Sequence, residues 1–216
     1  EAGGNMPRRT KAEAEQTRFL ILDAAADLFY EKGVSATSLA DIAARAGLTR
    51  GAIYWHFRNK VDLFNAIHAR VTLPLAEMRA GSLSQPDPLV ALRDYWVGAI
   101  RDVLTTDRKR RIIQVLFRKC EYVEDLEGIS RHLDAWAEQT VSVMTEALTE
   151  AQQKHLLASG IAPDVAACSA FSLITGILYW ATHPCSVGRC EEVEKAVTLF
   201  FTALRRPCVM APAGGS

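Results

Sequence analysis

The chain has 216 residues, with 25 basic and 25 acidic side chains and a formal net charge of zero. A hydrophobic fraction of 49% beside 23% charged residues is typical of a globular protein and excludes a disordered or fibrous chain. The zero net charge argues against a protein that coats nucleic acid through bulk electrostatics, although a local basic patch remains compatible with it.

Four helices are predicted in the first third of the chain, over residues 11–32, 38–46, 49–56 and 60–80. Ser38 with Asp41 three residues later forms a variant of the capping box, while Thr49 and Asn59 are N-cap residues for the next two helices. Short helices joined by a glycine-containing turn are typical of a helix-turn-helix, here over residues 38–57.

Residues 81–88 are predicted to be a connector rich in Gly, Ser and Pro. Five more helices are predicted after it, over residues 89–104, 108–122, 130–157, 163–183 and 191–206. Asp87 and Pro88 supply a cap and a proline at the first helical position. The predicted fold class is therefore all-α, with about nine helices. Residues 1–5, which precede Met6, are expected to be an expression remnant, and residues 207–216 a disordered tail.

Residues 165–188 carry no charge if His183 is neutral, and this run is long enough to cross a bilayer. It also contains Ser, Thr, Gly and Pro, and it lacks an asymmetry of flanking Lys and Arg. A helix without charge can instead be buried in a core or a subunit interface. We therefore expect no membrane insertion. The last two helices are expected to form a symmetric four-helix interface with a second copy.

The charges divide unevenly along the chain. Residues 6–60 hold nine basic and six acidic groups, a net charge of +3, whereas residues 61–216 carry a net charge of −2 and Glu1 supplies the remaining −1. The positive charge clusters in residues 7–11 and 50–60. These two segments are where DNA would be met.

Helical geometry sharpens this prediction. At about 100° per residue, Arg50, Gly51 and Tyr54 share one arc of the third helix, while Ala52 and Ile53 point toward a core. An arginine on the bare arc is suited to a guanine edge or a phosphate, and a glycine lets the backbone approach DNA closely.

Other polar groups near this helix suit phosphate contacts. Thr49, Tyr54 and His56 supply hydrogen-bond donors, and Lys60 adds a cation at a helix N-terminus. The alternative is that the aromatic residues 54–57 fill a core and the charges are solvated; Phe57 is expected to be in the core in either case.

The run Thr49-Arg50-Gly51-Ala52-Ile53-Tyr54-Trp55-His56-Phe57, with Gly33, Ala46-Gly47 and Lys60, resembles the DNA-binding domain of the TetR family of bacterial transcriptional regulators. The resemblance covers residues 15–75 and leaves residues 76–206 as a ligand-binding and dimerisation domain. It implies that operator DNA is contacted by nine residues: Thr37, Ser38, Thr49, Arg50, Gly51, Tyr54, Trp55, His56 and Lys60.

The run Leu116-Phe117-Arg118-Lys119-Cys120-Glu121, after the basic residues 108–111, resembles the AcrR-type branch of repressors of multidrug efflux operons. By position, this implies a ligand pocket that includes His68, Thr72, Lys109, Phe117 and Leu133. His68 and Thr72 replace a larger aromatic residue and an acid in that branch, so a shared preference for cationic drugs is not implied.

Three tryptophans add to this candidate pocket. Trp96, Trp136 and Trp180 either fill the helical core or line a cavity for a hydrophobic ligand. Glu121 has two interpretations, because it lies near Arg118 and Lys119: an intramolecular salt bridge, or an acceptor for a polar ligand.

The predicted function is a homodimeric, ligand-responsive repressor that binds a pseudo-palindromic double-stranded DNA operator and is released by a hydrophobic small molecule. The resemblance implies control of multidrug efflux and hence antibiotic resistance. No catalytic motif, cofactor motif or metal-ligand spacing is present in the sequence, so no enzyme, cofactor or metal is expected.

Five cysteines without a CxxC pair suit a reducing cytoplasm. The alternatives left open are a small-molecule-binding protein with a vestigial DNA domain, a transcriptional activator, and membrane association through residues 165–188.

Overall fold

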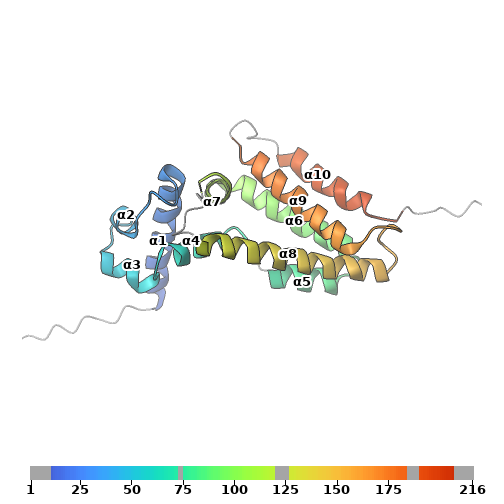
Figure 1. Cartoon of the computed structure of the whole chain (residues 1–216), viewed down its shortest axis with the longest axis horizontal. Helices are drawn as coiled ribbons and strands as arrows, with labels where there is room; N and C mark the ends of the chain where they lie inside the picture. The colour runs from blue at the N-terminus through green and yellow to red at the C-terminus, as the bar shows by residue number, and fades with distance from the viewer. Residues whose placement is uncertain (1–10, 73–74, 120–126, 184–189, 207–216) are drawn as a thin grey trace, which may run out of the picture. The chain divides into compact units, whose positions relative to one another are not determined.

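The computed structural model describes residues 11–72, 75–119, 127–183 and 190–206. The segments 1–5 and 207–216, the basic residues 7–10 and the candidate Glu121 lie outside the described residues. Within the described part of the chain there are ten helices and one isolated antiparallel bridge, between Leu157 and Arg205. The helices are α1 (Lys11–Lys32), α2 (Leu39–Arg45), α3 (Arg50–His56), α4 (Lys60–His68), α5 (Leu75–Ser84), α6 (Pro88–Thr105), α7 (Asp107–Arg118), α8 (Glu127–Gln153), α9 (Pro163–Ala181) and α10 (Cys190–Ala203) (Figure 1). The all-α prediction is confirmed, with one helix more than expected.

The additional helix corrects the predicted single helix over residues 60–80. That segment divides into α4, which ends at His68, and α5, which begins at Leu75. Pro74 lies between the two helices in the sequence, and proline cannot donate a backbone hydrogen bond and disfavours helix at the residue before it. Residues 81–84, predicted to belong to a connector, are the last residues of α5.

The chain divides into two compact units. The first unit comprises Glu1–Arg70 together with Gln114–Ser130, and the second comprises Val71–Ile113 together with Arg131–Ser216. This division differs from the expected contiguous domains, because residues 114–130 belong to the first unit although they follow much of the second in sequence. The ends of α7 and α8 that flank residues 120–126 are thus part of the unit that contains the helix-turn-helix.

The core of the first unit is formed by apolar side chains that helical spacing places on the inner faces of α1 to α4. The largest fully buried ones are Ile21, Phe29, Ile42, Ile53, Leu63, Phe64 and Ile67. Within this unit α2 packs between α1 and α3, and α4 packs on α1. This packing places α3 at the periphery, with one face buried and the other in solvent.

The second unit is built around α6, which contacts α5, α9 and α10. Its core includes Trp96, Met144 and Phe201. Two charged contacts fasten the helix ends: Arg101 on α6 donates two hydrogen bonds to Glu194 on α10, at 2.7 and 2.6 Å, and Arg205 pairs with the α6 cap Asp87.

Candidate nucleic-acid interface and effector residues

The recognition helix α3 begins where the sequence predicts. Thr49 has extended backbone angles, and its hydroxyl oxygen accepts a hydrogen bond from the amide of Ala52 at 3.2 Å. Ile53 is fully buried, and Phe57, which ends the helix, is 4% exposed. The inner face of α3 is therefore anchored in the core at its middle and at its C-terminal end.

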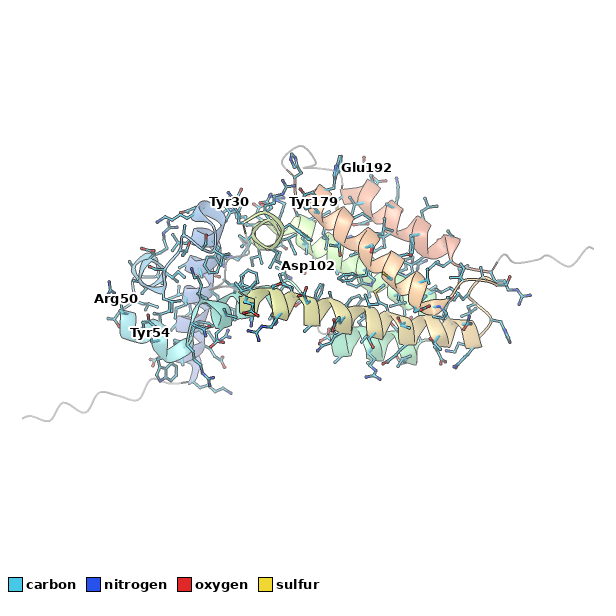
Figure 2. All side chains as sticks on the ribbon, in the orientation of Figure 1. Tyr30, Arg50, Tyr54, Asp102, Tyr179 and Glu192 are labelled. Atoms are coloured by element: carbon cyan, nitrogen blue, oxygen red, sulfur yellow. The ribbon has the colours of Figure 1, made fainter. Side chains whose placement is uncertain are left out.

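The opposite face of α3 is open to solvent. Arg50 and Gly51 are exposed, and the side chains of Tyr54 and Trp55 are 60% and 72% exposed. Figure 2 shows Arg50 and Tyr54 on the outer side of α3. The predicted separation of the two faces of this helix is observed, apart from Ala52, which is half-buried. A cation, two large aromatic rings and a side-chain-free position at Gly51 together suit a helix that enters the major groove.

The preceding helix α2 starts with the predicted capping box. The hydroxyl group of Ser38 accepts a hydrogen bond from the Asp41 amide at 3.1 Å and donates one to Asp41 Oδ2 at 2.7 Å, while the Ser38 amide donates to the same oxygen at 3.0 Å. The hydroxyl and amide of Ser38 hold the pKa of the Asp41 carboxyl below its usual range. Ser38 therefore fixes the start of α2 in addition to lying on the predicted DNA face.

Two further predicted DNA-contacting residues, Thr37 and Lys60, have hydrogen-bond partners within the protein. Thr37 is 1% exposed, and its hydroxyl donates to the carbonyl oxygen of Gly33 at 2.7 Å, so the expectation that its side chain reaches DNA is corrected. The Lys60 ammonium is half-buried and donates to the carbonyl oxygens of Val34 at 2.8 Å and Ser35 at 2.9 Å. Lys60 thereby binds α4 to the turn between α1 and α2.

Sequence reasoning missed two charged contacts that hold the helix-turn-helix in place. Arg45 on α2 donates to both carboxylate oxygens of Glu31 on α1, at 3.0 and 2.7 Å. The Arg18 guanidinium lies 5.0 Å from the centre of the Phe57 ring, directly after the recognition helix. No local motif signals either contact, because the partners are 14 and 39 residues apart in sequence.

The predicted effector residues are divided between the two units. His68, which is buried, and Phe117, which is half-buried, belong to the first unit. The remaining described candidates, Thr72, Trp96, Lys109, Leu133, Trp136 and Trp180, belong to the second. The predicted effector-binding residues therefore do not all belong to the second unit, as a ligand-binding domain over residues 76–206 would require.

Among the described effector candidates of the second unit, Trp96 alone is buried. Its side chain is 6% exposed in the apolar core, and its indole Nε1 has no hydrogen-bond partner among the described residues. Trp136 packs against Phe171 on α9 with ring centres 5.8 Å apart, and Lys109 pairs with Asp102 of α6. A buried indole donor in an apolar core suits an apolar ligand that carries one hydrogen-bond acceptor.

Trp180 requires a correction, because it does not lie in the core of its unit. Its side chain is 57% exposed on α9, next to Tyr179, which is 46% exposed. These two aromatic residues belong to an outward face of α9 that carries no charged residue after Asp164, which is exposed in the first turn of the helix. The described members of this face are Val165, Cys168, Ser169, Ser172, Gly176, Tyr179 and Trp180.

A groove on α8 has a different character from the predicted effector site. It has a volume of about 490 Å³ and is lined by Ser142, Thr145, Glu146, Thr149, Glu150 and Gln153. Its two carboxylates are paired, Glu146 with Arg79 at 2.9 Å and Glu150 with Lys154 at 3.2 Å. None of the predicted effector residues lines it, and every residue that lines it has a polar or charged side chain.

Comparison with known protein families gives two matches along the chain. Residues 21–67 match the family described as "Bacterial regulatory proteins, tetR family", and residues 87–205 match the "MAATS-type transcriptional repressor, C-terminal region". The first match contains the whole helix-turn-helix, and the second extends over more than half of the chain.

Characterised relatives match over nearly the full length. The chain is 36% identical over 203 residues to the HTH-type transcriptional regulator TtgR of Pseudomonas putida, a match that covers 93% of this chain and 97% of that protein. It is 33% identical over 204 residues to the HTH-type transcriptional regulator AcrR of Shigella flexneri, covering 91% and 93%.

Solved structures show the same similarity in three dimensions. The crystal structure of NalD, the secondary repressor of the MexAB-OprM multidrug efflux pump in Pseudomonas aeruginosa, has a TM-score of 0.82, with 32% sequence identity and coverage of 92% and 100%. The complex of SmeT with triclosan has a TM-score of 0.80, with 31% identity and coverage of 92% and 96%.

Proposed function

Because this chain belongs to the TetR family of bacterial transcriptional regulators, we propose that it is a homodimeric repressor of a multidrug efflux operon. It binds a pseudo-palindromic operator and is released by a hydrophobic small molecule. The observation that carries this proposal is the outward face of α3, where Arg50, Tyr54 and Trp55 are exposed on a helix whose other face is anchored by Ile53. The relatives NalD and SmeT, which are repressors of multidrug efflux pumps, support the class of target.

The interface with a second copy is proposed on α9 and α10. Beyond Asp164 the outward face of α9 is uncharged and includes Tyr179 and Trp180, and Leu199 on α10 is 70% exposed. An exposed apolar surface of this kind is typical of a protein-protein interface. Two copies paired about a twofold axis would present two recognition helices to successive major grooves.

The outward face of α9 also bears on the alternative that the protein associates with a membrane through residues 165–188. Among the described helices α9 alone has the length and composition to cross a bilayer. Its inner face is occupied, because Ala167, Ala170 and Ile174 are buried in the core of the second unit. We therefore assign the outward face to the second copy, and we place the protein in the cytoplasm, where it reaches DNA.

The effector is proposed to be an apolar compound that meets the Trp96 indole in the second unit. Ligand and operator then compete through a coupled equilibrium, so that each lowers the affinity for the other by the same factor. Triclosan is a suitable first compound, because the similar protein SmeT was solved in complex with it.

A gel-shift titration with the DNA upstream of the protein's own gene and of adjacent pump genes tests the proposal. We expect a sequence-specific complex that scrambled DNA does not form, and a marked loss of affinity between about 50 and 200 mM salt. Addition of triclosan should release the DNA. A flat salt dependence, or equal binding to scrambled DNA, would contradict an operator-binding function.

A further inference from the structure

The helix-turn-helix is held at both of its ends by residues from the middle of the chain. The amide of Val34, four residues before the α2 cap Ser38, donates to the carbonyl oxygen of Lys119 at 3.1 Å. Lys119 directly follows α7 and is the last described residue before position 127. The turn that leads into the helix-turn-helix is thus fastened to the end of α7.

The second contact lies just beyond the recognition helix. Gly128, in the first turn of α8, packs against Val61, the second residue of α4. A Cβ atom at position 128 would lie 2.9 Å from Cγ1 of Val61, closer than such contacts occur in proteins. The lack of a side chain at Gly128 therefore allows α8 to rest on α4, four residues after Phe57.

The two contacts are linked through Lys60. Its ammonium donates to the carbonyl oxygens of Val34 and Ser35, so the Val34 residue is held through its amide by Lys119 and through its carbonyl by Lys60. Lys60 is adjacent to Val61, which Gly128 contacts. The start of the helix-turn-helix, the start of α4 and the two described flanks of residues 120–126 therefore form one connected set of contacts inside the first unit.

We propose that residues 114–119 and 127–130 act as a bracket that positions the helix-turn-helix, with Gly128 as a positioning residue. Helices α7 and α8 both continue from this bracket into the second unit, where the effector is proposed to bind. The bracket then carries the effector's influence to both ends of residues 38–57. This inference rests on the proposed function for its regulatory consequence, but the positioning itself is a property of the first unit alone.

The variant Gly128→Ala tests the bracket, with Gly98→Ala as the matched control. Both glycines lie in helices, but a Cβ at position 98 meets nothing within 4 Å. We expect G128A to lower operator affinity by on the order of tenfold, since overpacking shifts neighbouring backbone, and G98A to leave it within about twofold. The double variant V61A/G128A, in which the clashing methyl groups are removed, should recover most of the loss.

Amide hydrogen exchange without DNA or effector gives a second readout that does not depend on repression. In G128A the amides of residues 38–57 and of Val34 should exchange faster than in the wild type, and in V61A/G128A they should return toward wild-type rates. The thermal midpoint and the oligomeric state are measured alongside, to separate positioning from a general loss of stability.

The outcomes distinguish the two proposals. If G128A matches G98A in both operator affinity and exchange, the bracket does not position the helix-turn-helix. If the wild type binds no operator, the proposed function fails, while the exchange experiment still decides the bracket. Should G128A not fold, Val61→Ala alone opens the same contact, and unchanged exchange over residues 38–57 in that variant would overturn the inference.

Discussion

The ammonium group of Lys60 lies 2.8 Å from the carbonyl oxygen of Val34 and donates a hydrogen bond to it, across the turn that precedes the helix-turn-helix. A second bond reaches Ser35 at 2.9 Å. The family resemblance places Lys60 at a DNA-contacting position, whereas its contacts within the protein give it a structural role. The two roles make different predictions for the free protein.

Replacing Lys60 by Met should lower the free energy of unfolding by about 1–3 kcal/mol, because two hydrogen bonds from a charged donor to the carbonyl oxygens of Val34 and Ser35 are lost. Urea unfolding in the absence of DNA measures this change. Lys11→Met, at an exposed lysine of α1, serves as the control and should be nearly neutral. Equal stability of the two variants would mean that Lys60 acts on DNA alone.

Arg50→Ala should remove sequence-specific operator binding while leaving the dimer intact, since Arg50 is exposed on α3. Loss of a bidentate contact to a base costs about 1–3 kcal/mol of discrimination. Gel-shift titrations against operator and scrambled DNA measure the difference. Arg79→Ala is the matched control, because that arginine is exposed on α5 in the second unit; a control variant that loses as much specificity would contradict a base-reading role for Arg50.

The capping box makes the stability of α2 depend on pH. The folded-state pKa of Asp41 lies below its unfolded value, owing to the hydroxyl and amide of Ser38, so its contribution is fully present above the unfolded pKa of about 3.9 and is lost as the pH falls through the folded pKa. Asp41→Asn should therefore be less stable than the wild type at pH 6, and the difference should narrow in strong acid. Urea unfolding of both proteins between pH 6 and strong acid measures the difference in their free energy of unfolding. A difference that does not change with pH would contradict a stabilising role for the charged Asp41 carboxylate.

Leu199→Glu should produce monomers, because it would place a charge in the proposed interface on α10. Leu83→Glu is the control: Leu83 is 41% exposed on α5, away from that face in sequence and helix. Sedimentation velocity measures the oligomeric state of both variants. If Leu199→Glu remains dimeric, the interface does not lie on this face.

Trp96→Phe should weaken binding of effectors that carry a hydrogen-bond acceptor while leaving the fold intact. The indole donor has no hydrogen-bond partner in the described structure, so its removal costs the free protein little beyond the smaller ring. Isothermal titration with triclosan, alongside a matched hydrocarbon without oxygen, separates the contribution of the indole hydrogen bond from that of the shape of the ring. A similar loss of affinity for both ligands would show that Trp96 contributes shape alone.

The sequence was most informative where the cause of a structure is local. Ser38 and Asp41, Thr49, and Asp87 before Pro88 each cap a helix through partners within a few residues, and α2, α3 and α6 begin as predicted. The prediction of a single helix over residues 60–80 was wrong, because Pro74 lies between α4 and α5 in the sequence and disfavours a continuous helix.

The remaining differences depend on contacts distant in sequence. Thr37 is buried because Gly33 offers it an acceptor in a turn whose shape the whole first unit determines. Trp180 lies outside the core because other residues of α9 fill the inner face. The contacts of Lys119 with Val34 and of Gly128 with Val61 join residues that no helical period or motif relates.

The participation of residues 114–130 in the first unit has a consequence for engineered sensors. Consider a chimaera that takes residues 1–70 from this chain and the remainder from a relative. In it, Val34 and Val61 would face the relative's residues at positions 119 and 128. Because Gly128 leaves room for Val61, a bulkier residue there would collide with it even though the cut lies far away in sequence. A transplantable DNA-reading module therefore consists of two segments, 1–70 and 114–130, and a graft should carry both.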